Sequence, residues 1–183
     1  SDVVDIRVSG LVGRCGPVYG KENRIVSCTN RGNIFVSGNT PGSVSVGGIS
    51  SNYSFRVDSC ENHSVVKVNA YEGSAYVGGV SSASMGITYC FNRDSVICES
   101  DGFEVQVGGV CSYSSYNSLQ TDSLYTCGNE GEIEVKSNGS MLSVGGVMGQ
   151  NTDCPVGMLF MQVDWSDIVK NRCTIAIIEE ISL

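Results

Sequence analysis

The sequence has few charged residues, and few of those are basic. Only 16% of its 183 residues are charged, and 11 Lys and Arg stand against 19 Asp and Glu, for a net charge of −8 and a pI near 4.5. Nucleic acids and anionic membranes both attract basic surfaces. We therefore expect no nucleic-acid partner. The lack of any apolar run of membrane-spanning length predicts no membrane insertion by this segment.

Histidine is almost absent, which limits catalysis and metal binding. His63 is the one histidine, and no Cys-x-x-Cys occurs among nine cysteines, so the usual zinc ligands are missing. A Ser-His-Asp triad in this chain has to use His63. The residues at the same position in the other repeats, which are described below, are Arg31, Arg93 and Glu130. Such a mixture of side chains is typical of a solvent-facing turn. No phosphate-cradling glycine loop occurs either. We expect no catalytic residue, no metal site and no cofactor.

Two acidic clusters leave an enzymatic alternative open. They comprise Glu99, Asp101 and Glu104, then Glu130, Glu132 and Glu134. Paired carboxylates hydrolyse glycosides, and β-helices host enzymes that cleave acidic polysaccharides. Glu132 and Glu134 nevertheless alternate with Ile133 and Val135, as on a solvated strand face. The sequence favours solvated charges over a polysaccharide-cleaving site.

Glycine is abundant, at 23 residues, and much of it lies in a repeat. Val-Gly-Gly followed by an aliphatic residue starts at residues 46, 77, 107 and 144, and Val8-Ser9-Gly10-Leu11 is a variant of it. Cys-x-Asn starts at residues 28, 60, 90 and 127. The spacing from Cys to the next Val is 17 or 18 residues, whereas the spacing from Val to Cys ranges from 13 to 20. One half of each unit is constant and the other tolerates insertion, as in stacked repeats.

The constant half shows the two-residue alternation of strands. An aliphatic pair follows each Cys-x-Asn, and the residues expected to point outward between the two aliphatics are Phe35, Lys67, Ile97 and Glu134. A second strand precedes each Val-Gly-Gly, and its outward row is Arg7, Ser45, Tyr76, Gln106 and Ser143. After the Gly pair the apolar residue falls one step out of phase, which indicates a bend or bulge.

Three short strands per unit predict an all-β fold, a parallel β-helix-like solenoid of about four to five rungs. The units start near Val8, Val46, Val77, Val107 and Val144, so the solenoid covers residues 1–149, and residues 150–183, which include Trp165, form a non-repeat cap. A propeller blade needs a longer unit of four strands, and a sandwich of hairpins needs antiparallel partners. Both are less favoured than the solenoid.

Two rows of equivalent residues should stack inside such a solenoid. Cys28, Cys60, Cys90 and Cys127 are expected to be buried, reduced thiols, because parallel Cβ vectors rarely give a disulfide dihedral. Asn30, Asn62, Asn92 and Asn129 are expected to form a hydrogen-bonded ladder, which would bury the glycosylation sequon at Asn62. Cys98 belongs to the apolar row of Val36, Val68 and Val135. A disulfide stays open among the remaining cysteines, Cys15, Cys111, Cys154 and Cys173.

The variable half carries the candidate binding residues. Units one and four are longer there, between Val12 and Ser27 and between Cys111 and Thr126, and the inserts contain Tyr19, Arg24, Tyr113, Tyr116 and Tyr125. Tyrosine among Ser and Asn is typical of surfaces that bind glycans or proteins. The alternative is that the inserts only cover the side of the solenoid. We expect both inserts to project from one edge, with a saddle between them lined by Tyr53, Phe55, Ser84 and Met85.

The repeat resembles the GLUG-motif repeats of bacterial surface proteins. Val77-Gly78-Gly79-Val80 followed by Cys90-Phe91-Asn92 and Val96-Ile97-Cys98 illustrates the likeness, which spans roughly residues 6 to 149, with Ser9 replacing a glycine in the first unit. The resemblance implies a secreted or cell-surface, adhesin-like module with no enzymatic activity, whose partner is a host or matrix glycan or protein. The motif is structural, so no functional residue transfers with it. A stalk or spacer role stays open.

Overall fold

The computed structural model describes residues 4–14, 23–52, 55–115, 124–138, 140–152 and 159–161. Within these ranges the chain consists of strands and turns, with no helix, and all the strand pairs are parallel. Several predictions lie outside the described residues, namely those for Tyr19, Tyr53, Tyr116, Trp165, Cys15, Cys154 and Cys173. The all-β, parallel character predicted from the repeat is confirmed.

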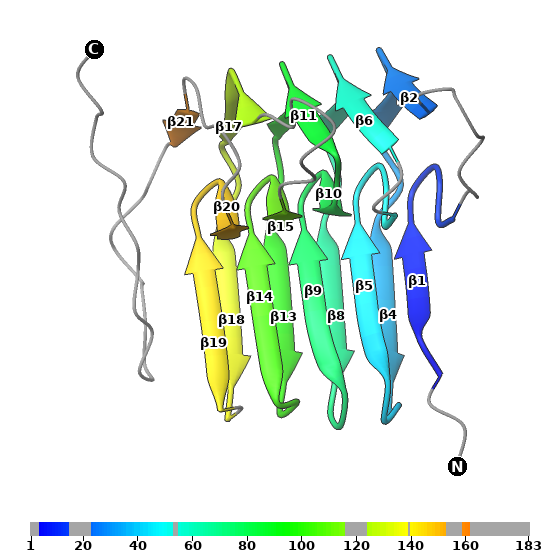
Figure 1. The fold of residues 1–183 in the computed structure, drawn as a ribbon, viewed down its shortest axis with the longest axis vertical. Helices are drawn as coiled ribbons and strands as arrows, with labels where there is room; N and C mark the ends of the chain where they lie inside the picture. The colour runs from blue at the N-terminus through cyan, green and yellow to red at the C-terminus, as the bar shows by residue number, and fades with distance from the viewer. Residues whose placement is uncertain are drawn as a thin grey trace.

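The strands form five sheets, and each sheet takes one strand from successive repeats (Figure 1). Sheet 1 contains β1 (Ile6–Ser9), β5 (Ser43–Gly47), β9 (Ser74–Gly78), β14 (Glu104–Gly108) and β19 (Met141–Gly145). Sheet 2 contains β10 (Ser81–Ala83), β15 (Cys111–Ser115) and β20 (Met148–Thr152). Sheet 3 contains β2 (Asn23–Val26), β6 (Phe55–Asp58), β11 (Gly86–Thr88) and β16 (Leu124–Tyr125).

The other two sheets are built from the constant half of the repeat. Sheet 4 contains β3 (Thr29–Asn30), β7 (Glu61–Asn62), β12 (Phe91–Asn92), β17 (Cys127–Asn129) and β21 (Leu159–Met161). Sheet 5 contains β4 (Ile34–Gly38), β8 (Val66–Ala70), β13 (Val96–Ser100) and β18 (Ile133–Ser137). Figure 1 shows sheet 5 behind sheet 1, with its strands running the opposite way. This arrangement is compatible with a parallel β-helix.

Each of the first four repeats contributes four or five strands, more than the three that its pattern predicts. The third repeat, residues 74–100, carries β9, β10, β11, β12 and β13. The reason is the corner before each Cys-x-Asn, where Ser27, Ser59, Tyr89 and Thr126 have φ between 50° and 54°. This left-handed conformation turns the chain sharply, so Cys-x-Asn lies on a sheet of its own between sheets 3 and 5.

Equivalent residues pair in register from repeat to repeat. Val46 aligns with Val8 and Val77, and Cys98 aligns with Val68 and Val135. The predicted parity is also confirmed, since Val66 and Val68 are buried while Lys67 between them is exposed. Phe35, a large apolar side chain in the outward row, is 68% exposed. Position in the repeat therefore decides burial more strongly than hydrophobicity does.

Two apolar clusters form the core. One lies between sheets 1 and 5 and is built from aliphatic rows such as Val46, Val77 and Val107. The other lies inside sheets 2, 3 and 4 and contains Cys60, Cys90 and Cys127, with Cys28 packed against it. These four cysteines are free thiols, as predicted, and so are Cys98 and Cys111. Burying such small apolar rows holds the repeats together.

The asparagines form the predicted ladder beside the second core cluster. Asn30 donates to Asn62 Oδ1 at 2.9 Å, Asn62 to Asn92 Oδ1 at 2.8 Å, and Asn92 to Asn129 Oδ1 at 2.7 Å. Each Nδ2 also donates to the carbonyl two residues on, for example Asn62 to Ser64 at 2.7 Å. All four side chains are buried, so this satisfied network specifies the register of the stack.

Stacking continues past residue 149, where the recognisable repeat ends. β20 pairs with β15 through Thr152, and β21 pairs with β17 so that Leu159 aligns with Cys127 and Met161 with Asn129. Parallel strands pair through backbone groups, which any side chain except proline permits. The rest of the predicted cap, from residue 162 onward, lies outside the described residues.

Candidate ligand-binding groove

The Gly pair bends the chain so that the outward row of sheet 1 becomes concave. The first glycine of each pair follows an inward valine, so it lies at an outward position. A Cβ added to this glycine would overlap the carbonyl oxygen of the residue three positions further along the chain. That oxygen is Ser50 O beside Gly47 and Ser81 O beside Gly78. The chain therefore turns toward the outer face of sheet 1, and sheet 2 stands beside that face as a second wall.

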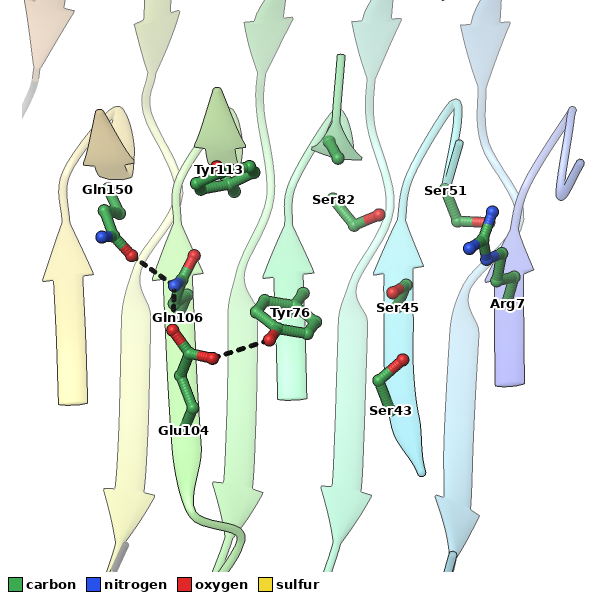
Figure 2. Close-up of a pocket in the computed structure, with 11 residues that line it drawn as sticks. Arg7, Ser43, Ser45, Ser51, Tyr76, Ser82, Glu104, Gln106, Tyr113 and Gln150 are labelled. Carbon is green, nitrogen blue, oxygen red and sulfur yellow. Dashed lines mark hydrogen bonds between the residues drawn. The ribbon is translucent and has the colours of Figure 1, made fainter. Parts of the chain in front are cut away.

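Between these walls lies a pocket of about 460 Å³, which we call the groove (Figure 2). It is lined by Arg7, Ser43, Ser45, Ser51, Tyr76, Ser82, Ala83, Glu104, Gln106, Tyr113 and Gln150. The members on sheet 1 are the outward row and the residues two positions earlier. The groove therefore crosses the strands, and at about 4.8 Å per strand its sheet 1 row from Arg7 to Gln106 extends about 14 Å.

One end of the groove is a polar network around one carboxylate. Tyr76 donates its hydroxyl hydrogen to Glu104 Oε2 at 2.7 Å, and Gln106 Nε2 donates to Glu104 Oε1 at 2.6 Å. Gln106 Nε2 also donates to Gln150 Oε1. Burial and then the hydrogen bond to Glu104 raise the pKa of Tyr76 to about 12. Figure 2 shows these side chains pointing toward one another from three neighbouring repeats.

Two buried oxygens that belong to lining residues have no hydrogen-bond partner among the described residues. They are Gln106 Oε1 and Ser82 Oγ, and their residues are 3% and 1% exposed. A buried polar atom without a partner costs about 1–3 kcal/mol. Most such atoms in folded proteins are paired with protein or water. These two oxygens are therefore hydrogen-bond acceptors that the described residues leave unused.

Arg7 provides the cation at the other end of the groove. It is exposed, and its Nη1 donates to Asn52 Oδ1 at 3.4 Å. Glu104 and Arg7 are the charged residues among those that line the pocket. The groove therefore has a negative end and a positive end, separated mainly by serine hydroxyls and the Tyr76 ring.

The structure does not bring together the predicted binding residues that it describes. Tyr113 lines the groove, but Arg24 and Tyr125 lie at opposite edges of sheet 3, on β2 and β16. Arg24 forms an ion pair with Asp58 at 3.3 Å. Tyr125 packs edge-to-face on Tyr89, with ring centroids 5.9 Å apart. One of these three predicted residues therefore belongs to the groove.

The predicted saddle is wrong for two of its residues. Phe55 is buried in the core cluster inside sheets 2, 3 and 4. Ser84 is buried and donates its hydroxyl hydrogen to Phe55 O and Gly86 O at 2.8 and 2.9 Å. Met85 is half-buried. The short repeats run directly into sheet 3, so these two residues of their variable half lie inside the molecule.

The enzymatic candidates from the sequence do not come together in the groove. His63 pairs with Glu61 Oε2 at 2.7 Å, and Arg93 bridges Glu61 and Glu130 beside the Phe91 ring. Arg93 and then His63 hold the pKa of Glu61 below its usual range. Of the six acidic residues in the two clusters, only Glu104 lines the groove. The described part of the chain contains no cluster of His, Cys, Asp and Glu suited to a metal ion.

Sequence reasoning missed the groove although it identified the outward row. Ser45, Tyr76 and Gln106 were expected to face solvent, yet Gln106 is buried and Tyr76 is half-buried. The signal was the glycine at the next outward position, Gly47, Gly78 or Gly108. A residue without a Cβ at an outward position permits the chain to fold toward the outside.

Comparisons with protein-family models, curated proteins and solved structures give no match to this chain. In the described residues no helix is present that is long and apolar enough to span a membrane.

Proposed function

We propose that the chain is a non-enzymatic surface module that binds an extended, polar ligand, a glycan, in the groove. The observation that carries this proposal is the pair of unpartnered buried oxygens, Gln106 Oε1 and Ser82 Oγ, within a groove lined by hydroxyl, amide and aromatic groups. Sugar hydroxyls both donate and accept hydrogen bonds, and sugar rings pack on tyrosine faces. The groove crosses successive repeats, which suits a chain of sugar rings better than one small molecule.

The proposal includes a closed architecture and a surface location. We propose that the five sheets close into a parallel β-helix, in which sheets 1 and 5 enclose one apolar cluster and sheets 2, 3 and 4 enclose the other. The likeness of the repeat to the GLUG motif supports secretion or display on a cell surface, with an adhesin-like role. A crystal structure of the protein tests the closure directly.

A glycan array followed by calorimetric titration of any hit tests the binding. Tyr113→Ala should weaken binding by roughly tenfold, because it removes an aromatic wall of the groove. Tyr125→Ala is the matched control, since the same change is made on an exposed tyrosine outside the groove. Equal losses in the two variants, or no glycan binding by the wild-type protein, would refute the proposal.

A polysaccharide-cleaving enzyme is the second candidate, favoured by the placement of Glu104 in the groove. Glycoside hydrolysis usually needs two carboxylates flanking the bond, and no second Asp or Glu is among the residues lining this pocket. Release of reducing ends from a bound polysaccharide, lost in Glu104→Gln, would establish this function and exclude the non-enzymatic one.

A further inference from the structure

The hydrogen-bonding capacity left at the Glu104 end of the groove is almost all of one kind. Gln106 Nε2 uses its two hydrogens on Glu104 and Gln150, so its Oε1 is left as an acceptor. Tyr76 uses its hydroxyl hydrogen on Glu104, so its oxygen is left as an acceptor that Ser74 shares. Each Glu104 oxygen accepts one of these bonds and keeps capacity for another. A ligand group that lies here has to donate hydrogen bonds.

The charge at the same place selects among donors. Glu104 is half-buried, so its carboxylate is screened less than an exposed one. The other charged residue lining the groove, Arg7, lies on β1, three strands from β14. At about 4.8 Å per strand its guanidinium is too far away to neutralise Glu104. A donor with a positive charge is therefore favoured over a neutral hydroxyl, and an anionic group is disfavoured.

We infer that the groove takes a glycan that carries a free, protonated amine, and that this amine lies against the Glu104 carboxylate. The inference rests on the proposed function, because it names the class of glycan for the same site. The amine places its hydrogens between Glu104, Gln106 Oε1 and the Tyr76 oxygen. The rest of the sugar chain extends across β9 and β5 toward Arg7, past the hydroxyls of Ser45 and Ser51.

A lysine side chain of a peptide has the same ammonium group, but the groove suits a peptide less well. β9 and β14 are paired on both edges, so they offer no open strand edge for an extended peptide to join. Among the lining residues only Ala83 is a small apolar side chain, and the two aromatics are tyrosines. The lining therefore matches the alternating hydroxyls and ring faces of a sugar chain.

The test is a panel of hexasaccharides titrated calorimetrically in mildly acidic buffer. The probes are β-1,4-linked oligomers of glucosamine, N-acetylglucosamine, glucose and a uronic acid, together with an oligolysine peptide. The glucosamine oligomer should bind roughly tenfold more tightly than the glucose and N-acetylglucosamine oligomers, because a charge-assisted bond replaces a neutral one. The uronic acid oligomer should bind most weakly.

Two variants assign the preference to Glu104. Glu104→Gln should reduce the ratio of glucosamine to glucose affinity from roughly tenfold to roughly twofold or less. Glu132→Gln removes the same charge from an exposed residue outside the groove and should keep the full preference. Far-UV circular dichroism verifies the fold of both variants, and the wild-type panel decides the question even if Glu104→Gln does not fold.

The outcomes separate the inference from the proposed function. Equal affinity for the glucose and glucosamine oligomers overturns the inference and leaves glycan binding intact. Tighter binding of the uronic acid oligomer than of the glucosamine oligomer also overturns the inference and leaves glycan binding intact. Binding of oligolysine with no binding of any oligosaccharide overturns both, and so does a panel in which nothing binds.

Discussion

The substitution Gly79→Ala tests the packing of the repeat most directly. Gly79 is the second glycine of its pair, and an added Cβ would meet Gly109 O and the side chain of Asn92, with Asn92 Nδ2 at 2.7 Å. Cβ atoms do not approach other heavy atoms so closely, so the alanine has to displace the Asn92 side chain or the neighbouring backbone.

The magnitude follows from the hydrogen bonds that Asn92 makes. It accepts from Asn62 at 2.8 Å and donates to Asn129 Oδ1 at 2.7 Å and to Asp94 O. Each bond contributes about 1 kcal/mol net, and more where a buried partner is left unpaired. Displacing the side chain should therefore lower the free energy of unfolding by about 3 kcal/mol or more, a large part of the 5–15 kcal/mol that is typical of folded domains.

Urea unfolding followed by far-UV circular dichroism measures this loss, and Gly38→Ala is the control. A Cβ at Gly38 has nothing within 4 Å, so that variant should stay within about 0.5 kcal/mol of the wild-type protein. The slope of the unfolding curve should be unchanged in both. A Gly79→Ala variant as stable as Gly38→Ala would refute the account of the Asn ladder.

Three further outcomes are expected. Val68→Ala removes two buried methyl groups and should lower the free energy of unfolding by about 2 kcal/mol. Phe35→Ala should change it by less than about 0.5 kcal/mol, because Phe35 is exposed. Equal losses of the two variants in urea titrations would contradict this expectation. Tyr76, whose pKa is raised from 10.0 to about 12 by burial and by Glu104, should contribute stability below pH 10 that is lost as pH rises through 12. In a pH titration followed by absorbance, the rise that reports the Tyr76 phenolate near pH 12 should be absent from Tyr76→Phe. Asn62 is buried, so mass spectrometry of protein from a glycosylating host should find it unmodified.

The spacing of the repeat was sufficient to predict the columns of the structure. Because like residues recur at fixed distances and the strands pair in parallel, Asn62 had to lie between Asn30 and Asn92, and Cys98 between Val68 and Val135. The same periodicity predicted which residues of each strand point inward. These features depend on local alternation and on pairing of equivalent positions, both of which are visible in one sequence.

The candidate site was less accessible to such reasoning. Composition pointed to the tyrosine-bearing inserts, and of the residues predicted there Tyr113 lines the groove. Glu104 appeared in an acidic cluster that the pattern assigned to solvent. Its role depends on Tyr76, 28 residues away in the sequence, and on Gln106, which donates in turn to Gln150, 44 residues further along. Such cross-repeat neighbours become visible only when the strands are stacked.

The sequence by itself determined the period, the parallel register and the two faces of each strand, because these follow from residue spacing and backbone pairing. The tertiary structure decided which outer face became concave. A glycine pair permits the chain to bend in more than one direction, and the direction is chosen by the packing of the next strand. Here Ser50 O and Ser81 O occupy the space beside Gly47 and Gly78, so the chain folds over the outward row. That bend buries Gln106 within the groove instead of leaving it on an open surface.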